Sequence, residues 1–229
     1  FISFSVFKRI DWALFGRILK KGSLLIISQM MWVLSESFTA AIYNGRGNAA
    51  VVSGMAASFS IANLFFISFD GITTATGVLI GKSLGRNELD DARKEKTWML
   101  SAAIIFGCIM CLVGVVTVLL VPVVFGNLSI DAQNICRAML LLMALFMPLW
   151  TFVNTQLAVC RAGGDTKVGF LVDGGTTAVM IPMLLILAFF TNASPVMMYF
   201  GVKALDVGKI IVATHEMKKE RWVVNLSNA

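Results

Sequence analysis

The sequence predicts an all-α, polytopic membrane protein with six transmembrane helices. Hydrophobic residues make up 58% of the 229 residues and charged residues only 14%, whereas globular domains carry about 25% charged residues. The mean hydropathy is +0.83, and the apolar residues gather in six long stretches. Each stretch reaches the roughly 20 residues that a helix needs to cross about 30 Å of hydrocarbon while satisfying its own backbone.

The apolar stretches alternate with polar connections. The predicted spans are Gly22 to Asn44, Ser53 to Gly81, Trp98 to Phe125, Ala132 to Cys160, Val168 to Phe190 and Pro195 to Thr214. Pro148 lies in the middle of the fourth span and Pro182 in the second half of the fifth. Because proline removes a backbone hydrogen bond, we expect both helices to bend there.

The basic residues predict how the chain is oriented. Fifteen of the 19 Lys and Arg residues fall in the first 21 residues, in the second and fourth connections, or after the last span. Arg46 and Arg137 lie on the other side, and Lys203 and Lys209 lie inside the last span. Because cytoplasmic segments are rich in Lys and Arg, we expect both chain ends to lie on the cytoplasmic side of a cell membrane, such as the bacterial inner membrane.

The mixture of aromatic and basic residues near the N-terminus predicts an amphipathic segment on the membrane surface. We therefore expect a cytoplasmic linker over residues 1–21, a transmembrane lobe over residues 22–214 and a cytoplasmic tail over residues 215–229. The chain begins with Phe rather than Met, and we expect it to be a piece of a longer protein.

Several features that suggest other functions are better explained by membrane helices. The net charge of +6 would fit a nucleic-acid partner, but such proteins gather their basic residues on one soluble face. The IGKS run at 80–83 lacks the first glycine of a phosphate-binding loop, because Thr76 stands there. Cys108 and Cys111 lie in an apolar run, where cysteines pack as small hydrophobes. Asp70 and Asp173 lack the Gly-x-Gly-Asp motif of intramembrane aspartyl proteases, and we predict no catalytic residues.

Acids inside the predicted spans are the first candidates for a functional site, because an ionised group is costly in hydrocarbon. These acids are Glu36, Asp70, Asp173 and Asp206. At 1.5 Å per residue, Glu36 lies about 21 Å from Gly22 and Asp70 about 18 Å from Lys82, so both fall at a similar depth. We predict that Glu36 and Asp70 share a cavity and bind a coupling cation or an organic cation. Alternatively, they are hydrogen-bonded and only hold helices together.

Amides accompany both acids. Gln29 lies seven residues before Glu36, and Asn63 lies seven residues before Asp70, so each amide shares a helix face with its acid. We therefore include Gln29 and Asn63 in the predicted site.

The fourth and fifth spans contribute three further candidate site residues. Asn154 and Gln156 lie among aromatic residues, a mixture that suits flat, weakly polar ligands. Asp173 lies only about 8 Å inside the cytoplasmic end of its span, so it is weaker evidence for an intramembrane site.

The last span carries regularly spaced charges. Lys203, Asp206 and Lys209 recur every three residues, a spacing that permits an ion pair on one helix face. We interpret these charges as compensating one another rather than as a binding site.

Three motifs lie at the ends of the predicted spans. They are GVLIGKSLGRNELDDARK at Gly77 to Lys94, RAGGDTK at Arg161 to Lys167 and KKERWVVNLS at Lys218 to Ser227. In order and spacing these motifs resemble the C-terminal half of the multidrug and toxic compound extrusion transporters, the MATE family. The resemblance covers essentially the whole chain. It implies one six-helix lobe of a twelve-helix transporter, with an N-terminal lobe as its missing partner.

The resemblance also implies a function. Such transporters are antiporters that export cationic or amphiphilic drugs and toxins in exchange for sodium or protons. Glu36 is similar to the acid of the family's seventh helix, which implies a sodium site at Glu36 and no other metal or cofactor. In the sodium-coupled branch a second acid belongs in the helix holding Pro148 and Asn154, but the matching position here is Trp150. The expected partners are the lipid bilayer and small organic cations.

Two alternatives remain open at this point. A flippase for lipid-linked sugars, from the same broader superfamily, would need a basic cavity for phosphates, whereas the first five spans hold more acids than bases. Binding of lipid pyrophosphate without any organic cation would favour it. A non-transporting membrane scaffold would leave the costly acids without a purpose.

Overall fold

The computed structural model of the chain describes residues 12–224 and is helical throughout this range, with short turns between the helices. The helices are α1 (Trp12–Arg46), α2 (Ala49–Gly85), α3 (Leu89–Val124), α4 (Ile130–Ala162), α5 (Lys167–Phe190), α6 (Pro195–Ala204) and α7 (Asp206–Lys218). Within the described range, α1 to α5 are long and apolar enough to cross a membrane. The prediction of an all-α, multi-pass membrane protein is therefore confirmed.

Local sequence fixes where several helices begin. Asn48 precedes α2, and its side-chain oxygen accepts a hydrogen bond from the backbone N of Val51 at 3.1 Å. Ser129 caps α4 and Ser194 caps α6 in the same way, satisfying amides that the first helical turn leaves free. Between α2 and α3 the chain turns through Asn87, whose φ of 62° lies in the left-handed region that Asn tolerates.

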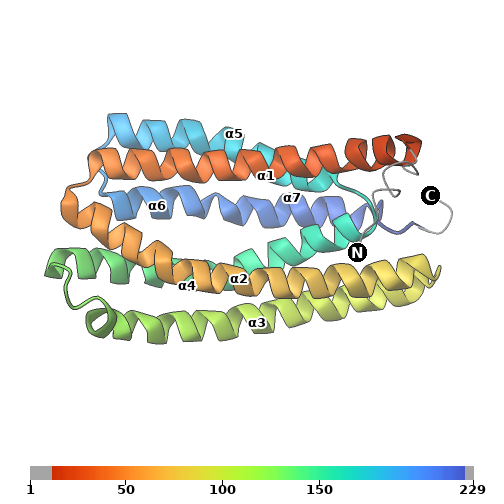
Figure 1. Cartoon of the computed structure of the whole chain (residues 1–229), viewed down its shortest axis with the longest axis horizontal. Coiled ribbons are helices and arrows are strands. Elements are labelled where there is room, and N and C mark those ends of the chain that lie inside the picture. The colour runs from red at the N-terminus through yellow and green to blue at the C-terminus, as the bar shows by residue number, and fades with distance from the viewer. Residues whose placement is uncertain (1–11, 225–229) are drawn as a thin grey trace, which may run out of the picture.

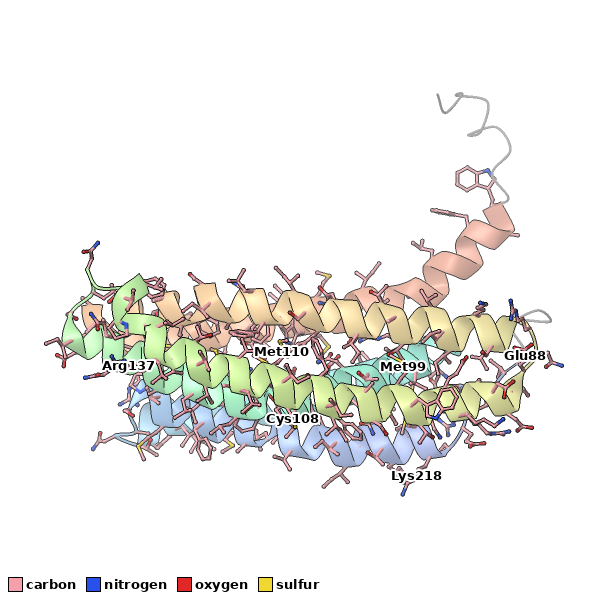
Figure 2. All side chains as sticks on the ribbon, turned by 90° about the horizontal axis from the view of Figure 1, so that it is seen from below. Glu88, Met99, Cys108, Met110, Arg137 and Lys218 are labelled. Carbon is pink, nitrogen blue, oxygen red and sulfur yellow. The ribbon has the colours of Figure 1, made fainter. Side chains whose placement is uncertain are left out.

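The long helices run antiparallel, so their connections gather at two ends of the bundle (Figure 1). One end carries the α2–α3 and α4–α5 connections and the end of α7, and we call it the basic end because most described Lys and Arg residues lie there. Figure 2 labels Glu88 at the basic end and Arg137 at the opposite end.

Helix α4 forms the centre of the bundle, packing along α2 and α3 and touching α7, while α1 packs mainly on α5. The α3–α4 contact depends on small residues, because a Cβ added to Gly107 would lie 2.5 Å from the Cα of Pro148. Gly114 faces Ala144 in the same way. Small residues let membrane helices approach closely, and α4 remains helical through Pro148.

Large apolar side chains cover the outside of the bundle. On α3, Ile105, Leu112 and Leu119 are 63%, 67% and 72% exposed. Apolar surfaces of this extent need a partner other than water, and lipid supplies it for a chain with five membrane-spanning helices.

The sixth predicted span is not one continuous helix, which corrects the sequence analysis. Helices α6 and α7 lie end to end (Figure 1) and meet at Leu205. There the backbone N of Leu205 donates to Val202 O at 3.2 Å, and that of Gly208 donates to Leu205 O at 2.9 Å. Such bonds between residues three apart define a tight turn in which side chains at that spacing eclipse. Lys203 and Asp206 therefore point to the same side.

Residues 12–21 are the first turns of α1, and this part of α1 projects away from the bundle (Figure 2). Trp12, Phe15 and Leu19 are 71%, 49% and 55% exposed there. The rest of the predicted linker, residues 1–11, lies outside the described residues, as does the end of the predicted tail, residues 225–229.

Candidate functional site

A cavity of about 550 Å³ lies within the bundle, lined by residues of α1, α2, α4, α6 and α7 and by one residue of α5. Helices α1 and α2 are joined at one end and diverge toward the basic end, with α6 and α7 between them in Figure 1. Six of the seven predicted site residues line this cavity: Gln29, Glu36, Asn63, Asp70, Asn154 and Asp173. The structure brings these residues together, while their role in binding stays a prediction.

An ion pair between α1 and α6 lies in the wall of the cavity. The Nζ of Lys203 donates to Oε1 of Glu36 at 2.6 Å, and the two side chains are 11% and 27% exposed. The same Nζ lies 5.6 Å from the ring centroid of Trp150 and 5.5 Å from that of Tyr199. The ammonium is thus surrounded by a carboxylate and two aromatic rings. The sequence predicted that Lys203 compensates a charge of its own span, whereas the fold gives it Glu36 of α1 as its ion-pair partner.

Asp206 forms a second polar cluster beside this ion pair. Its Oδ2 accepts a hydrogen bond from Nε1 of Trp150 at 2.8 Å, and its Oδ1 lies 3.1 Å from Nζ of Lys209. The Asp206–Lys209 pair confirms the prediction of an ion pair within the last span. Trp150 stands where the resemblance implies an acid in the sodium-coupled branch, and the fold brings the Asp206 carboxylate of α7 to this residue.

Asp70 is an exposed carboxylate in the cavity lining. No hydrogen bond or ion pair links its side chain to another described side chain. Phe66 and Phe69 line the cavity around it, and the ring of Phe66 lies 6.0 Å from that of Trp150. A carboxylate attracts cations by its charge, and aromatic faces attract them as well.

The two predicted amides of α4 differ in their positions. Asn154 lines the cavity, and its Nδ2 donates to the backbone O of Trp150 at 2.9 Å. Gln156 does not line the cavity, and its role in binding stays a prediction. It is fully buried, and its Nε2 donates to Oγ1 of Thr214 at 2.8 Å, joining α4 to α7. Residues two apart on a helix point in different directions.

The basic end of the cavity holds Asp173 and Arg161. Oδ2 of Asp173 accepts a hydrogen bond from Oγ of Ser28 at 3.0 Å, which links α5 to α1. Arg161 extends from the end of α4 into the lining, and its Nε is buried without a hydrogen bond. Asp173 therefore helps to hold α1 against α5 as well as lining the cavity.

The basic side of this cavity was not predicted from the sequence. The lining contains four acids and three bases: Glu36, Asp70, Asp173 and Asp206, with Arg161, Lys203 and Lys209. No sequence spacing predicts the Glu36–Lys203 pair, because 167 positions separate its members. Within residues 12–224, no group of three or more His, Cys, Asp or Glu side chains is arranged to hold a metal ion.

A bundle of membrane-spanning helices around a polar and aromatic cavity is an architecture that membrane transporters share. A comparison with protein families matches the MatE model over residues 25–186, which is well over half of the chain. The chain therefore belongs to the MatE family of membrane transporters. Comparisons with curated proteins and with solved structures give no match.

Proposed function

We propose that the chain is the C-terminal lobe of a secondary antiporter that exports cationic or amphiphilic drugs and toxins in exchange for sodium or protons. In this proposal both chain ends lie on the cytoplasmic side of the cell membrane, and a second lobe completes the transport path. Family membership supports transport as the activity. The choice of cations as substrates depends on the chemistry of the cavity.

The observation that carries the proposal is a pair of carboxylates in one aromatic-lined cavity. Glu36 and Asp70 lie on adjacent helices and both line it, with Trp150, Phe66 and Tyr199 among the aromatic residues around them. Carboxylates neutralise a cation, and ring faces attract it further. An antiporter also needs groups that can hold either the substrate or the coupling ion, and intramembrane acids serve both purposes.

The proposal is tested by efflux of ethidium from vesicles driven by a proton or sodium gradient. The chain is joined to an N-terminal lobe of the family, and the parent is compared with Glu36→Gln and Asp70→Asn. We expect each substitution to reduce the initial efflux rate at least tenfold at equal membrane insertion, because each removes a cation ligand. The gradient that supports efflux in the parent identifies the coupling ion.

A matched control removes an acid outside the cavity. Asp90 is 88% exposed at the basic end, where it pairs with Arg93, so Asp90→Asn should retain the parent rate. Full efflux in both cavity variants would refute the site, and absence of efflux in the parent under either gradient would argue against the antiporter.

A flippase for lipid-linked sugars is the second candidate, favoured by one observation. Arg161, Lys203 and Lys209 give the cavity more positive charge than the sequence bias predicted. However, Lys203 and Lys209 are already paired with acids, which leaves Arg161 as the lining base without a described acidic partner. Saturable binding of a lipid pyrophosphate, together with no binding of ethidium, would favour the flippase.

A further inference from the structure

Lys203 occupies the position in the cavity that best suits a cation. Its ammonium lies 2.6 Å from the Glu36 carboxylate and about equally far from two aromatic rings, 5.6 Å from Trp150 and 5.5 Å from Tyr199. A carboxylate with aromatic faces around it is the combination that recognises ammonium groups of ligands. The protein's own side chain therefore already fills this place.

The two partners differ in how accessible they are. The side chain of Lys203 is 11% exposed, whereas that of Glu36 is 27% exposed and lines a cavity of about 550 Å³. A ligand that enters the cavity therefore reaches the carboxylate, but Lys203 already neutralises the charge that would attract it. A second cation at Glu36 would meet the repulsion of the first.

Lys203 also has a second acid within the same wall. The tight turn at Leu205 points Lys203 and Asp206 to the same side of the α6–α7 segment, and Asp206 is only 5% exposed. In this conformation Asp206 binds Trp150 and Lys209. When the Lys203 ammonium leaves Glu36, its flexible stem lets it move toward the Asp206 carboxylate without entering lipid. It would then share this carboxylate with Lys209.

We propose that Lys203 is a tethered cation that closes the Glu36 site, and that an organic cation binds at Glu36 by displacing the Lys203 ammonium toward Asp206. This inference rests on the proposed function and deepens it, since it makes Glu36 a site for one positive charge at a time. Lys203 then sets how tightly the cavity holds a monovalent amphiphilic cation. The exchange involves no covalent step.

The test is equilibrium binding of ethidium to the purified chain in detergent, followed by its fluorescence at fixed ionic strength. Lys203→Gln removes the competing charge but keeps a long polar side chain. We expect at least tenfold tighter binding, equivalent to 1.4 kcal/mol. The double variant Glu36→Gln/Lys203→Gln should lose this gain, because it lacks the carboxylate. Lys94→Gln removes a paired, 65% exposed base that does not line the cavity, and it should bind as the parent does.

Lys203→Arg keeps the positive charge, so it remains informative if Lys203→Gln does not fold. Its affinity for ethidium should stay within threefold of the parent or be weaker, and a tenfold gain would overturn the inference. Unchanged or weaker binding in folded Lys203→Gln would overturn it as well.

The outcomes separate this inference from the proposed function. Tighter binding in Lys203→Gln without efflux from the joined lobes supports the tethered cation and rejects the antiporter. Efflux that depends on Glu36 and Asp70, together with unchanged affinity in Lys203→Gln, rejects only the tethered cation. Absence of ethidium binding in the parent and in every variant rejects both.

Discussion

Replacing Gly163 with alanine should detach the segment that follows α7 from the basic end. A Cβ at this position would lie 1.9 Å from the backbone O of Trp222, 2.5 Å from its C and 2.6 Å from its Cα. Because side-chain Cβ atoms keep at least 3.0 Å from such neighbours, the Trp222 backbone has to move by about 1 Å or more. Backbone atoms cannot rotate away as the end of a flexible side chain can.

The energetic cost follows from what Trp222 contributes. Its ring is 1% exposed within a core that includes Cys160, Val168 and Met217, and its Nε1 donates to Met217 O at 3.2 Å. Burial of about 150–250 Å² at about 25 cal/mol per Å² gives roughly 4–6 kcal/mol for complete removal of the ring. Because the segment can shift without leaving entirely, we expect a loss of about 2–4 kcal/mol.

Thiol labelling provides the assay for Gly163→Ala. Cys160 is 1% exposed in the same core, so its reaction with a maleimide reports opening of this region. We expect faster labelling of Cys160 and a lower midpoint of thermal unfolding in detergent. Gly85→Ala is the matched control, because a Cβ on Gly85 meets nothing within 4 Å. Parent-like labelling and stability in Gly163→Ala would refute the argument.

Three further predictions concern ionic contacts. Arg46→Met removes a guanidinium that donates to the last carbonyls of α5, so stability should fall by about 1–2 kcal/mol; an unchanged unfolding midpoint would contradict this role. Glu36→Gln leaves the Lys203 charge unpaired and should lower the unfolding midpoint, whereas Glu36→Gln/Lys203→Gln should recover at least half of the loss; additive effects of the two substitutions would show no coupling. Lys219 donates to Glu216 and holds the pKa of that carboxyl below its usual value. The resulting stabilisation is up to about 0.5 kcal/mol. It should be present above the ordinary glutamate pKa of about 4.3 and lost as pH falls through the lowered pKa of Glu216. An equal pH dependence of stability in Glu216→Gln would exclude this contribution.

Much of the fold could be predicted because hydrophobic length and helix caps act locally. Four of the first five predicted spans fall inside the observed helices, and the third ends one residue past α3, since lipid leaves a spanning segment no other way to satisfy its backbone. The break at Leu205 was missed because residues 202–207 contain neither Pro nor Gly to mark it. The break is favoured by tertiary contacts, because it directs both Lys203 and Asp206 toward the cavity.

Part of the candidate site could also be predicted, because depth in a membrane helix follows from counting residues. Counting placed Glu36 and Asp70 at a similar level, and both line the same cavity. Counting does not give rotation relative to neighbouring helices, which is why it could not show that Gln156 lies outside the cavity lining. It also cannot pair Lys203 with Glu36, which belong to helices at opposite ends of the sequence.

The sequence by itself determined that this chain is a bundle of membrane helices with costly acids in its interior, because burial of apolar length and the charge of each side chain are properties of local composition. Only the tertiary structure decided which charges meet. It set Lys203 against Glu36, brought Asp206 to Trp150, and pressed Trp222 against Gly163. Ion pairs and close contacts depend on distances of a few ångströms between helices, and these distances are fixed by packing rather than by any residue's own neighbours in the chain.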